Sequence, residues 1–356
     1  MGAAGNFFED FRIGQEFRHA PPRTLTEADG TLYAALYGSR FPLHCARTVA
    51  QKLGLAGTPL DDLLVFHVVF GKSVPDISLN AVANLGYAGG VMGALVFPGD
   101  TLSARSTVIG LKENSNRKTG VVWVETVGVN QDGRAVARYV RWVMVRKRDE
   151  KAPAPAPCVP DLPAAVPAEK LIVPDGLNLS GYDAAMSGEA RLWDDYTPGE
   201  RIDHADGITI EEAEHMMAAR LYHNTARVHF NQHAEKDGRF GRRIVYGGHV
   251  VSIARALSFN GLANAFRIAA INAGAHVAPV FAGDTVYAWS EVLEKMELPG
   301  RAPSQPPGQP NVGALRLRTI AAKDHPCADF PGRAGEGYDA GVVLDLDYTV
   351  LIPRRL

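Results

Sequence analysis

Residues 193–229 read WDDYTPGERIDHADGITIEEAEHMMAARLYHNTARVH, and residues 8–44 follow the same pattern. Adding 185 to a residue number between 8 and 44 gives the number of its counterpart between 193 and 229. No gap is needed from Phe8 to His44. Identical pairs include Gly14 and Gly199, Tyr37 and Tyr222, and His44 and His229. Similarity at a fixed offset indicates a duplicated unit. The sequence therefore predicts two copies of one domain.

A proline-rich segment separates the two copies. Residues 151–174 read KAPAPAPCVPDLPAAVPAEKLIVP. Proline at every second or third position removes backbone donors and favours an extended, semi-rigid spacer. We therefore expect a first module over residues 1–150, a linker over 151–174, and a second module over 175–356, which carries the candidate active site. A chain of 356 residues is long enough for two domains.

The composition is that of an ordinary soluble protein. Hydrophobic residues make up 46% of the chain and the formal charge is −2, which argues against nucleic acid as the main partner. Cys45, Cys158 and Cys327 are too far apart to form a disulfide framework or a metal-ligand pattern. No secretory signal is recognisable at the N-terminus, and the uncharged run from 77 to 99 is interpreted as buried strands. We expect a cytoplasmic protein without a membrane partner.

Each copy has the same predicted order of elements. A helix preceded by a capping box (Thr24–Glu27 and Thr209–Glu212) leads to a polar loop and then to a long apolar helix. Strands with alternating polarity follow, ending in a long hairpin. The second copy has two Gly/Pro-rich insertions, Pro299–Pro310 and Asp324–Gly341, which we interpret as surface loops. This order predicts an α+β fold in which a sheet wraps round one buried helix.

The stretch from Leu221 to His249 carries the candidate chemistry. Its polar loop holds Asn224 and His229, and the turn Tyr246-Gly247-Gly248 opens the apolar helix. Free amides and the positive dipole end at a helix start can stabilise an oxyanion. An imidazole beside that helix start can move a proton. The stretch therefore predicts an acid–base site.

These residues resemble the MaoC-like (R)-specific enoyl-CoA hydratases, a family with the hot-dog fold. In that family a loop places Asp and His five positions apart, and a His-Gly pair starts the central helix. The second copy has Asn224, His229 and Tyr246-Gly247 at these places, whereas the first has Ser39, His44 and Asp61-Asp62. Within the family, a tandem (double) hot-dog of this length is most similar to the mesaconyl-CoA (2-methylfumaryl-CoA) hydratases. The resemblance implies reversible addition of water to mesaconyl-CoA, giving β-methylmalyl-CoA.

The resemblance also implies site residues, although neither copy keeps the family's Asp. We expect His229 to carry proton transfer nearly alone, Asn224 to position the water, and Gly247 to donate its amide to the thioester oxygen. Arg227 replaces a proline of the family and is expected to pair with the free carboxylate of the substrate.

The substrate-binding set is expected to extend beyond Arg227. It also includes Tyr246, Gly248, Arg242, Arg243 and His44. Arg242 and Arg243 suit CoA phosphates, or else form part of a solvated loop. His44 is expected to be vestigial or to bind the substrate tail, because Asp61-Asp62 would repel an oxyanion.

Other functions and partners stay open at this point. A hot-dog thioesterase would use a carboxylate at the central helix, for which Asp61-Asp62 are the only hint, and a non-enzymatic acyl-CoA-binding module is a third alternative. His229 and His233 have the spacing of a helical metal pair, but no nearby carboxylate or Cys completes a ligand set. We therefore expect no metal and no cofactor besides the CoA of the substrate, and a possible homo-oligomer.

Overall fold

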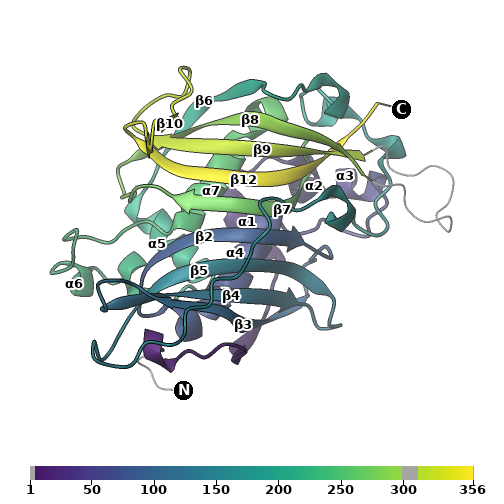
Figure 1. Cartoon of the computed structure of the whole chain (residues 1–356). Coiled ribbons are helices and arrows are strands. Elements are labelled where there is room, and N and C mark those ends of the chain that lie inside the picture. The colour runs from purple at the N-terminus through teal and green to yellow at the C-terminus, as the bar shows by residue number, and fades with distance from the viewer. Residues whose placement is uncertain (1–4, 299–311, 356) are drawn as a thin grey trace.

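A computed structural model describes residues 5–298 and 312–355 as two halves with the same order of elements (Figure 1). The first half contains β1 (Glu16–Thr24), α1 (Glu27–Tyr37), α2 (Pro42–Cys45), α3 (Arg47–Lys52), α4 (Asp62–Ser73), β2 (Ala81–Met92), β3 (Thr101–Glu113), β4 (Thr119–Val129) and β5 (Ala135–Arg146). The second contains β6 (Arg201–Thr209), α5 (Glu212–Leu221), η7 (Arg227–His229), α6 (Gln232–Glu235), α7 (Gly247–Leu257), α8 (Phe259–Leu262), β7 (Arg267–His276), β8 (Thr285–Glu297), β9 (Val312–Lys323) and β12 (Val342–Pro353).

The strands form one antiparallel sheet of ten strands, in the order β1-β3-β4-β5-β2-β7-β12-β9-β8-β6. Each half contributes five strands in the same relative order, and β2 pairs with β7 where the halves meet. In that junction Ala88 pairs with Ala273, its own counterpart in the repeat. The two halves are therefore related by an approximate twofold axis through the junction.

The long apolar helices lie behind the sheet, one in each half (Figure 1). Every residue of α4 is buried, as are ten of the eleven residues of α7, from Gly248 to Leu257. A helix that is apolar on all sides is stable only inside a core. Both helices belong to one hydrophobic cluster that joins the halves. The structure thus confirms the α+β, tandem hot-dog prediction and adds that the two sheets are continuous.

The proline-rich linker crosses the sheet on the face away from the helices (Figure 1). The backbone of Cys158 forms an antiparallel β-bridge with Leu111 of β3. The Val166 amide donates to the side-chain oxygen of Asn272 on β7, 2.9 Å away. Pro163 packs on β2 at Gly89, where an added Cβ would lie at an ordinary contact distance of 3.6 Å. The linker therefore carries the chain from the first half-sheet to the second. The module boundaries themselves stay a prediction.

The predicted capping boxes are wrong in both modules. Thr24 ends β1 and its hydroxyl lies 2.7 Å from that of Thr101, whereas Thr26 and Asp29 form the box that starts α1. Helix α5 starts after Glu211, which makes no side-chain cap hydrogen bond. In both modules the threonine hydroxyl of the expected box lies instead beside a threonine hydroxyl of the neighbouring strand, Thr24 beside Thr101 and Thr209 beside Thr285.

The remaining features concern the surface. The insertion 324–341 contains a small hairpin, β10 (Arg333–Ala334) with β11 (Gly337–Tyr338), whereas Pro299–Pro310 lies outside the described residues. None of the helices within residues 5–298 and 312–355 is long and apolar enough to span a bilayer.

Candidate active site

His229 ends the short turn η7, between α5 and α6. Its Nδ1 lies 3.0 Å from the carbonyl oxygen of Ile244. A carbonyl can only accept, so Nδ1 carries the proton and donates it. Nε2 is left with its lone pair, which is the form of imidazole that can act as a base.

The surroundings keep His229 neutral. Burial lowers its pKa to about 4, the hydrogen bond to Ile244 partly offsets this, and His215 and His276 lower it further. The residue still retains some exposed surface. A buried imidazole resists protonation because the charged form loses solvation. At neutral pH the ring is therefore neutral, with the lone pair of Nε2 unprotonated.

The start of helix α7 lies beside this ring. The centroids of the His229 and Tyr246 rings are 5.5 Å apart, and Tyr246 is the residue before Gly247, where the helix begins. The first amides of an α-helix have no partner within the helix and can donate to a ligand. The ring of the predicted base thus packs against the residue that precedes the predicted oxyanion donor.

Glycine at this helix start has a structural reason. A Cβ on Gly247 would lie 2.4 Å from the His276 ring, and one on Gly248 would lie 2.3 Å from the Tyr246 ring. His276 is the last residue of β7, and the hydroxyl of Tyr87 lies 3.4 Å from its Nε2. The site is therefore narrow and lined by rings.

The first module repeats this arrangement with one change. Nδ1 of His44 lies 3.2 Å from the Pro59 carbonyl oxygen, so the His44 ring is held as the His229 ring is. Nε2 of His44 lies 3.9 Å from Oδ2 of Asp62, the first residue of α4. The equivalence of the modules implies that Nε2 of His229 faces Gly247. In the first module, however, a carboxylate occupies the place of the oxyanion.

Asp62 is held firmly in that place. Its Oδ2 accepts from the Ile268 amide at 3.0 Å, and its Oδ1 lies 3.5 Å from Nε of the buried Arg267. Burial raises its pKa, whereas Arg267 and His44 lower it. The space at the start of α4 is therefore already occupied by the carboxylate of Asp62.

Asn224 lies on the other side of the loop. Asn224 is buried, and its Oδ1 accepts a hydrogen bond from the Ala226 amide at 3.0 Å. It lines a cavity of about 500 Å³ together with Lys72 and His223. Within residues 5–298 and 312–355 no hydrogen bond joins Asn224 to His229, and His229 is not among the residues that line this cavity. Its role in water positioning stays a prediction.

The three candidate arginines differ in their surroundings. Arg227 is exposed on η7, and Arg242 is exposed with its Cζ 4.0 Å from the Phe281 ring centroid. Arg243 instead pairs with Glu212, and only 12% of its side chain is exposed. Arg242 is therefore better placed than Arg243 to meet a CoA phosphate, a role that stays a prediction for both.

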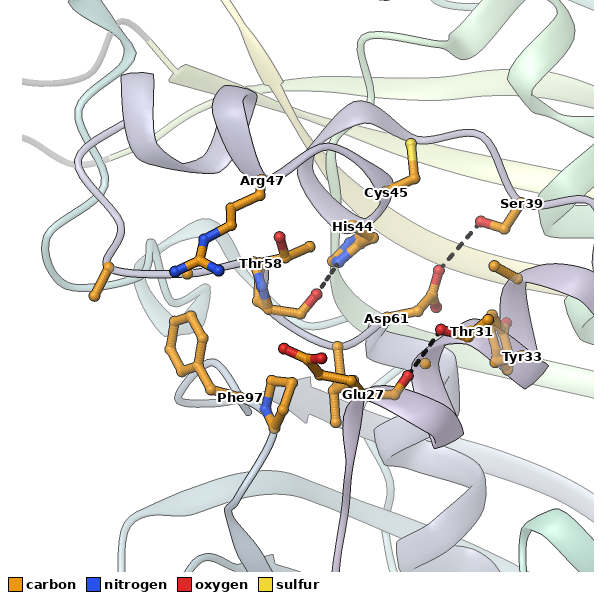
Figure 2. Close-up of a pocket in the computed structure, with 17 residues that line it drawn as sticks. Glu27, Thr31, Tyr33, Ser39, His44, Cys45, Arg47, Thr58, Asp61 and Phe97 are labelled. Carbon is orange, nitrogen blue, oxygen red and sulfur yellow. Dashed lines mark hydrogen bonds between the residues drawn. The ribbon is translucent and has the colours of Figure 1, made fainter.

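A cavity of about 670 Å³ opens in the first module, beside His44. Figure 2 shows His44 at this cavity and Ser39 turned to Asp61, with the Ser39 hydroxyl oxygen 3.4 Å from Oδ2 of Asp61. Neither this cavity nor the 500 Å³ cavity is lined by His229.

Two histidines at the site were not predicted. Nδ1 of His67, on α4, lies 3.3 Å from the Tyr246 hydroxyl oxygen, and burial lowers the pKa of His67 to about 3. His276 packs on Gly247, and its only signal in the sequence was a polar residue interrupting an apolar run. In the part of the chain that the structure describes, no three His, Cys, Asp or Glu side chains converge as metal ligands.

Comparison with known proteins adds a consistent set of similarities. The sequence profile of the mesaconyl-CoA hydratase family matches residues 2–333. The β-methylmalyl-CoA dehydratase of Chloroflexus aurantiacus is 64% identical over 352 residues, covering 99% of this chain and 98% of the relative. The mesaconyl-CoA hydratase of Cereibacter sphaeroides is 57% identical over 352 residues and covers 99% of each chain.

Solved structures agree with these sequence relatives. A structure from Chloroflexus aurantiacus, described as a MaoC domain protein dehydratase, has a TM-score of 0.95 and 63% identity, covering 100% of this chain and 99% of its own. A conserved Mycobacterium tuberculosis protein with a double hot-dog fold has a TM-score of 0.76 at 24% identity, covering 99% of each chain. The latter similarity concerns the fold alone.

Proposed function

The chain belongs to the mesaconyl-CoA hydratase family, and on this premise we propose that it reversibly hydrates mesaconyl-CoA to β-methylmalyl-CoA. The observation that carries the proposal is the neutral imidazole of His229 beside the start of α7. A 2-enoyl thioester needs both groups, because water must lose a proton while charge collects on the thioester oxygen.

The reaction can be written with His229 as the only acid–base group. Nε2 removes a proton from water as the oxygen bonds to Cβ, and the electrons of the double bond move to form the enolate. The imidazolium then returns that proton to Cα, so that one water has been added and His229 is neutral again. Since burial lowers the pKa of His229, its protonated form is a strong acid and gives the proton up readily.

Gly247 is proposed to donate its amide to the enolate oxygen. Removing one such donor typically lowers the rate by about 10²–10³. The expected role of Asn224 in holding the attacking water gains no support from its position, because Asn224 lines a cavity that His229 does not line. Tyr246 and Gly248 complete the wall, and Arg227 and Arg242 are proposed to meet the charged parts of the substrate.

Each chain is proposed to have one active site. The first module holds a carboxylate, Asp62, where the enolate would form, and a negative oxygen there opposes an oxyanion. His44 is therefore proposed to be vestigial or to contact the substrate tail. Assembly into a homo-oligomer remains an expectation, as does the absence of a cofactor besides the CoA of the substrate.

Incubation of the purified chain with mesaconyl-CoA tests the proposal. The expected result is loss of the enoyl-thioester absorbance and a product heavier by one water, with the thioester intact. Release of free thiol would indicate a thioesterase instead. Binding of mesaconyl-CoA without any turnover would indicate an acyl-CoA-binding module.

A further inference from the structure

The first module shows which residues surround the candidate site in the second. The wall of the 670 Å³ cavity includes Glu27, Gly30, Thr31, His44 and Thr58. Their counterparts 185 positions later are Glu212, His215, Met216, His229 and Arg243. The repeat puts these five residues at equivalent positions of the second module, and His215 is close enough to His229 to lower its pKa.

Arg243 places a guanidinium where the first module has a threonine. Its Nη2 pairs with Glu212, and its Nη1 lies 3.2 Å from the Met216 sulfur, which is a weak acceptor. Its Nε is buried, and no acceptor for it lies within residues 5–298 and 312–355. Two of its three nitrogens therefore lack an oxygen partner there.

The remaining nitrogen of Arg243, Nη2, donates to the carboxylate of Glu212. The same Oε2 lies 3.2 Å from Nε2 of the buried His215, so one oxygen has contacts with two basic side chains. Glu212 is nevertheless 58% exposed. Ion pairs with an exposed partner contribute little to stability, and the carboxylate of a ligand can add to this one or replace it.

The proposed substrate needs a cation at this location. In mesaconyl-CoA the free carboxylate is bonded to the carbon that receives the water, so its binding group must lie close to the base. Arg243 directly precedes Ile244, whose carbonyl holds the His229 ring. Guanidinium groups bind carboxylates through paired hydrogen bonds.

We propose that Arg243 binds the free carboxylate of the acyl group and thereby makes the site selective for dicarboxylic enoyl thioesters. This inference rests on the proposed function of the same site. It gives Arg243 a role in the acyl pocket in place of a contact with CoA phosphates. Arg227, exposed on the loop, then contributes much less to acyl selectivity.

Inhibition by saturated analogues tests the inference, with mesaconyl-CoA hydration as the reporter. Arg243→Met is expected to raise the inhibition constant of succinyl-CoA about 10²-fold, as for loss of one partner of a buried charged pair. The inhibition constant of butyryl-CoA should change less than about threefold, because butyryl-CoA has no carboxylate for Arg243 to bind. Arg227→Met is the comparison variant: any change it causes should be the same for both constants, because Arg227 would then contact only the CoA that the two analogues share.

Glu212→Gln separates binding from structural support. If Arg243 binds the ligand, removing its competing carboxylate should leave the inhibition constant of succinyl-CoA unchanged or lower it. Equal losses for both analogues in Arg243→Met would overturn the inference. So would a loss for succinyl-CoA but not for butyryl-CoA in Arg227→Met, or a loss for succinyl-CoA in Glu212→Gln. Where Arg243→Met leaves too little turnover for inhibition, equilibrium binding of both analogues gives the same comparison. Failure of the wild-type chain to hydrate mesaconyl-CoA would count against the proposed function instead.

Discussion

The hydroxyl of Tyr37 lies 2.7 Å from the hydroxyl of Tyr222, which is the same tyrosine of the repeat 185 positions later. A second equivalent pair, His67 and Ser252, meets at 3.0 Å. Both pairs are buried, so the approximate twofold axis passes through a polar network inside the core. This network reaches the site, because His67 also contacts the Tyr246 hydroxyl, 3.3 Å away.

The tyrosine pair predicts unequal costs for two similar substitutions. The Tyr37 hydroxyl contacts both Tyr222 and Nδ1 of His249, 2.9 Å away, whereas the Tyr222 hydroxyl is hydrogen-bonded to Tyr37. Tyr37→Phe leaves two buried groups without partners and should lower the free energy of unfolding by about 2–4 kcal/mol. Tyr222→Phe should cost about 1–2 kcal/mol. Urea denaturation measures both, and an equal or larger cost for Tyr222→Phe would contradict this view of the network.

The buried carboxylate of the first module predicts a stability effect that is separate from activity. Asp62→Asn removes the charge beside the buried Arg267 and should cost about 3–5 kcal/mol, since a buried charge is then unpaired. Asp61→Asn is the matched control, because Asp61 caps α4 through the Leu63 amide and Asn caps a helix equally well. The folded fraction of each variant should retain wild-type kcat. A large loss of kcat in folded Asp62→Asn would place the first module in the reaction.

Gly247 predicts an effect on activity with little loss of stability. In Gly247→Ala the new methyl group would lie 2.4 Å from the His276 ring, which must then turn toward the space before the helix. We expect kcat/KM for mesaconyl-CoA to fall at least about 10-fold, since the oxyanion donor is obstructed. The melting temperature should fall by only a few degrees, about that of a 1 kcal/mol loss. Wild-type kcat/KM in this variant would exclude Gly247 as the donor position.

The buried histidines predict acid sensitivity of the fold. Burial lowers the pKa to about 3 for His67 and His249, and to about 4 for His204, His229 and His276. The unfolded chain binds these protons near pH 6.5, whereas the folded chain does not until about pH 4 or below. Stability should therefore fall as the pH drops from about 6.5 toward 4, by about 1.4 kcal/mol per pH unit for each histidine.

Thermal unfolding between pH 4.5 and 8 checks this expectation, since the melting temperature should be highest at neutral pH. Activity provides a second check, because His229 is already neutral throughout the range in which the protein is folded. The pH dependence of kcat/KM should be flat from about pH 6 to 8, with no histidine inflection near 6.5. An inflection there would show that His229 is solvated in the free enzyme.

Much of the fold follows from the sequence because local patterns determine it. The fixed offset of 185 and the apolar runs of α4 and α7 are properties of the chain itself. The continuous sheet is different, because pairing of β2 with β7 joins the edges of two different modules. The capping boxes failed for a similar reason, since Thr24 and Thr209 are engaged by threonines across the sheet.

The site was predictable where one segment contains both partners. His229 and Tyr246 lie on either side of one loop, and their rings pack together with centroids 5.5 Å apart. His67 reaches Tyr246 from the other module, and the Glu212–Arg243 pair joins a helix to a distant loop. Such contacts depend on packing between elements, which spacing in the sequence does not encode.

The direct test of the central claim is the rate of mesaconyl-CoA hydration in His229→Gln, with His44→Gln measured beside it as the matched variant of the first module. The account predicts that His229→Gln lowers kcat by about 10²–10⁴ while the protein stays folded, and that His44→Gln stays within about threefold of wild type. A His229→Gln protein that hydrates mesaconyl-CoA at the wild-type rate, or an equal loss in His44→Gln, would contradict it.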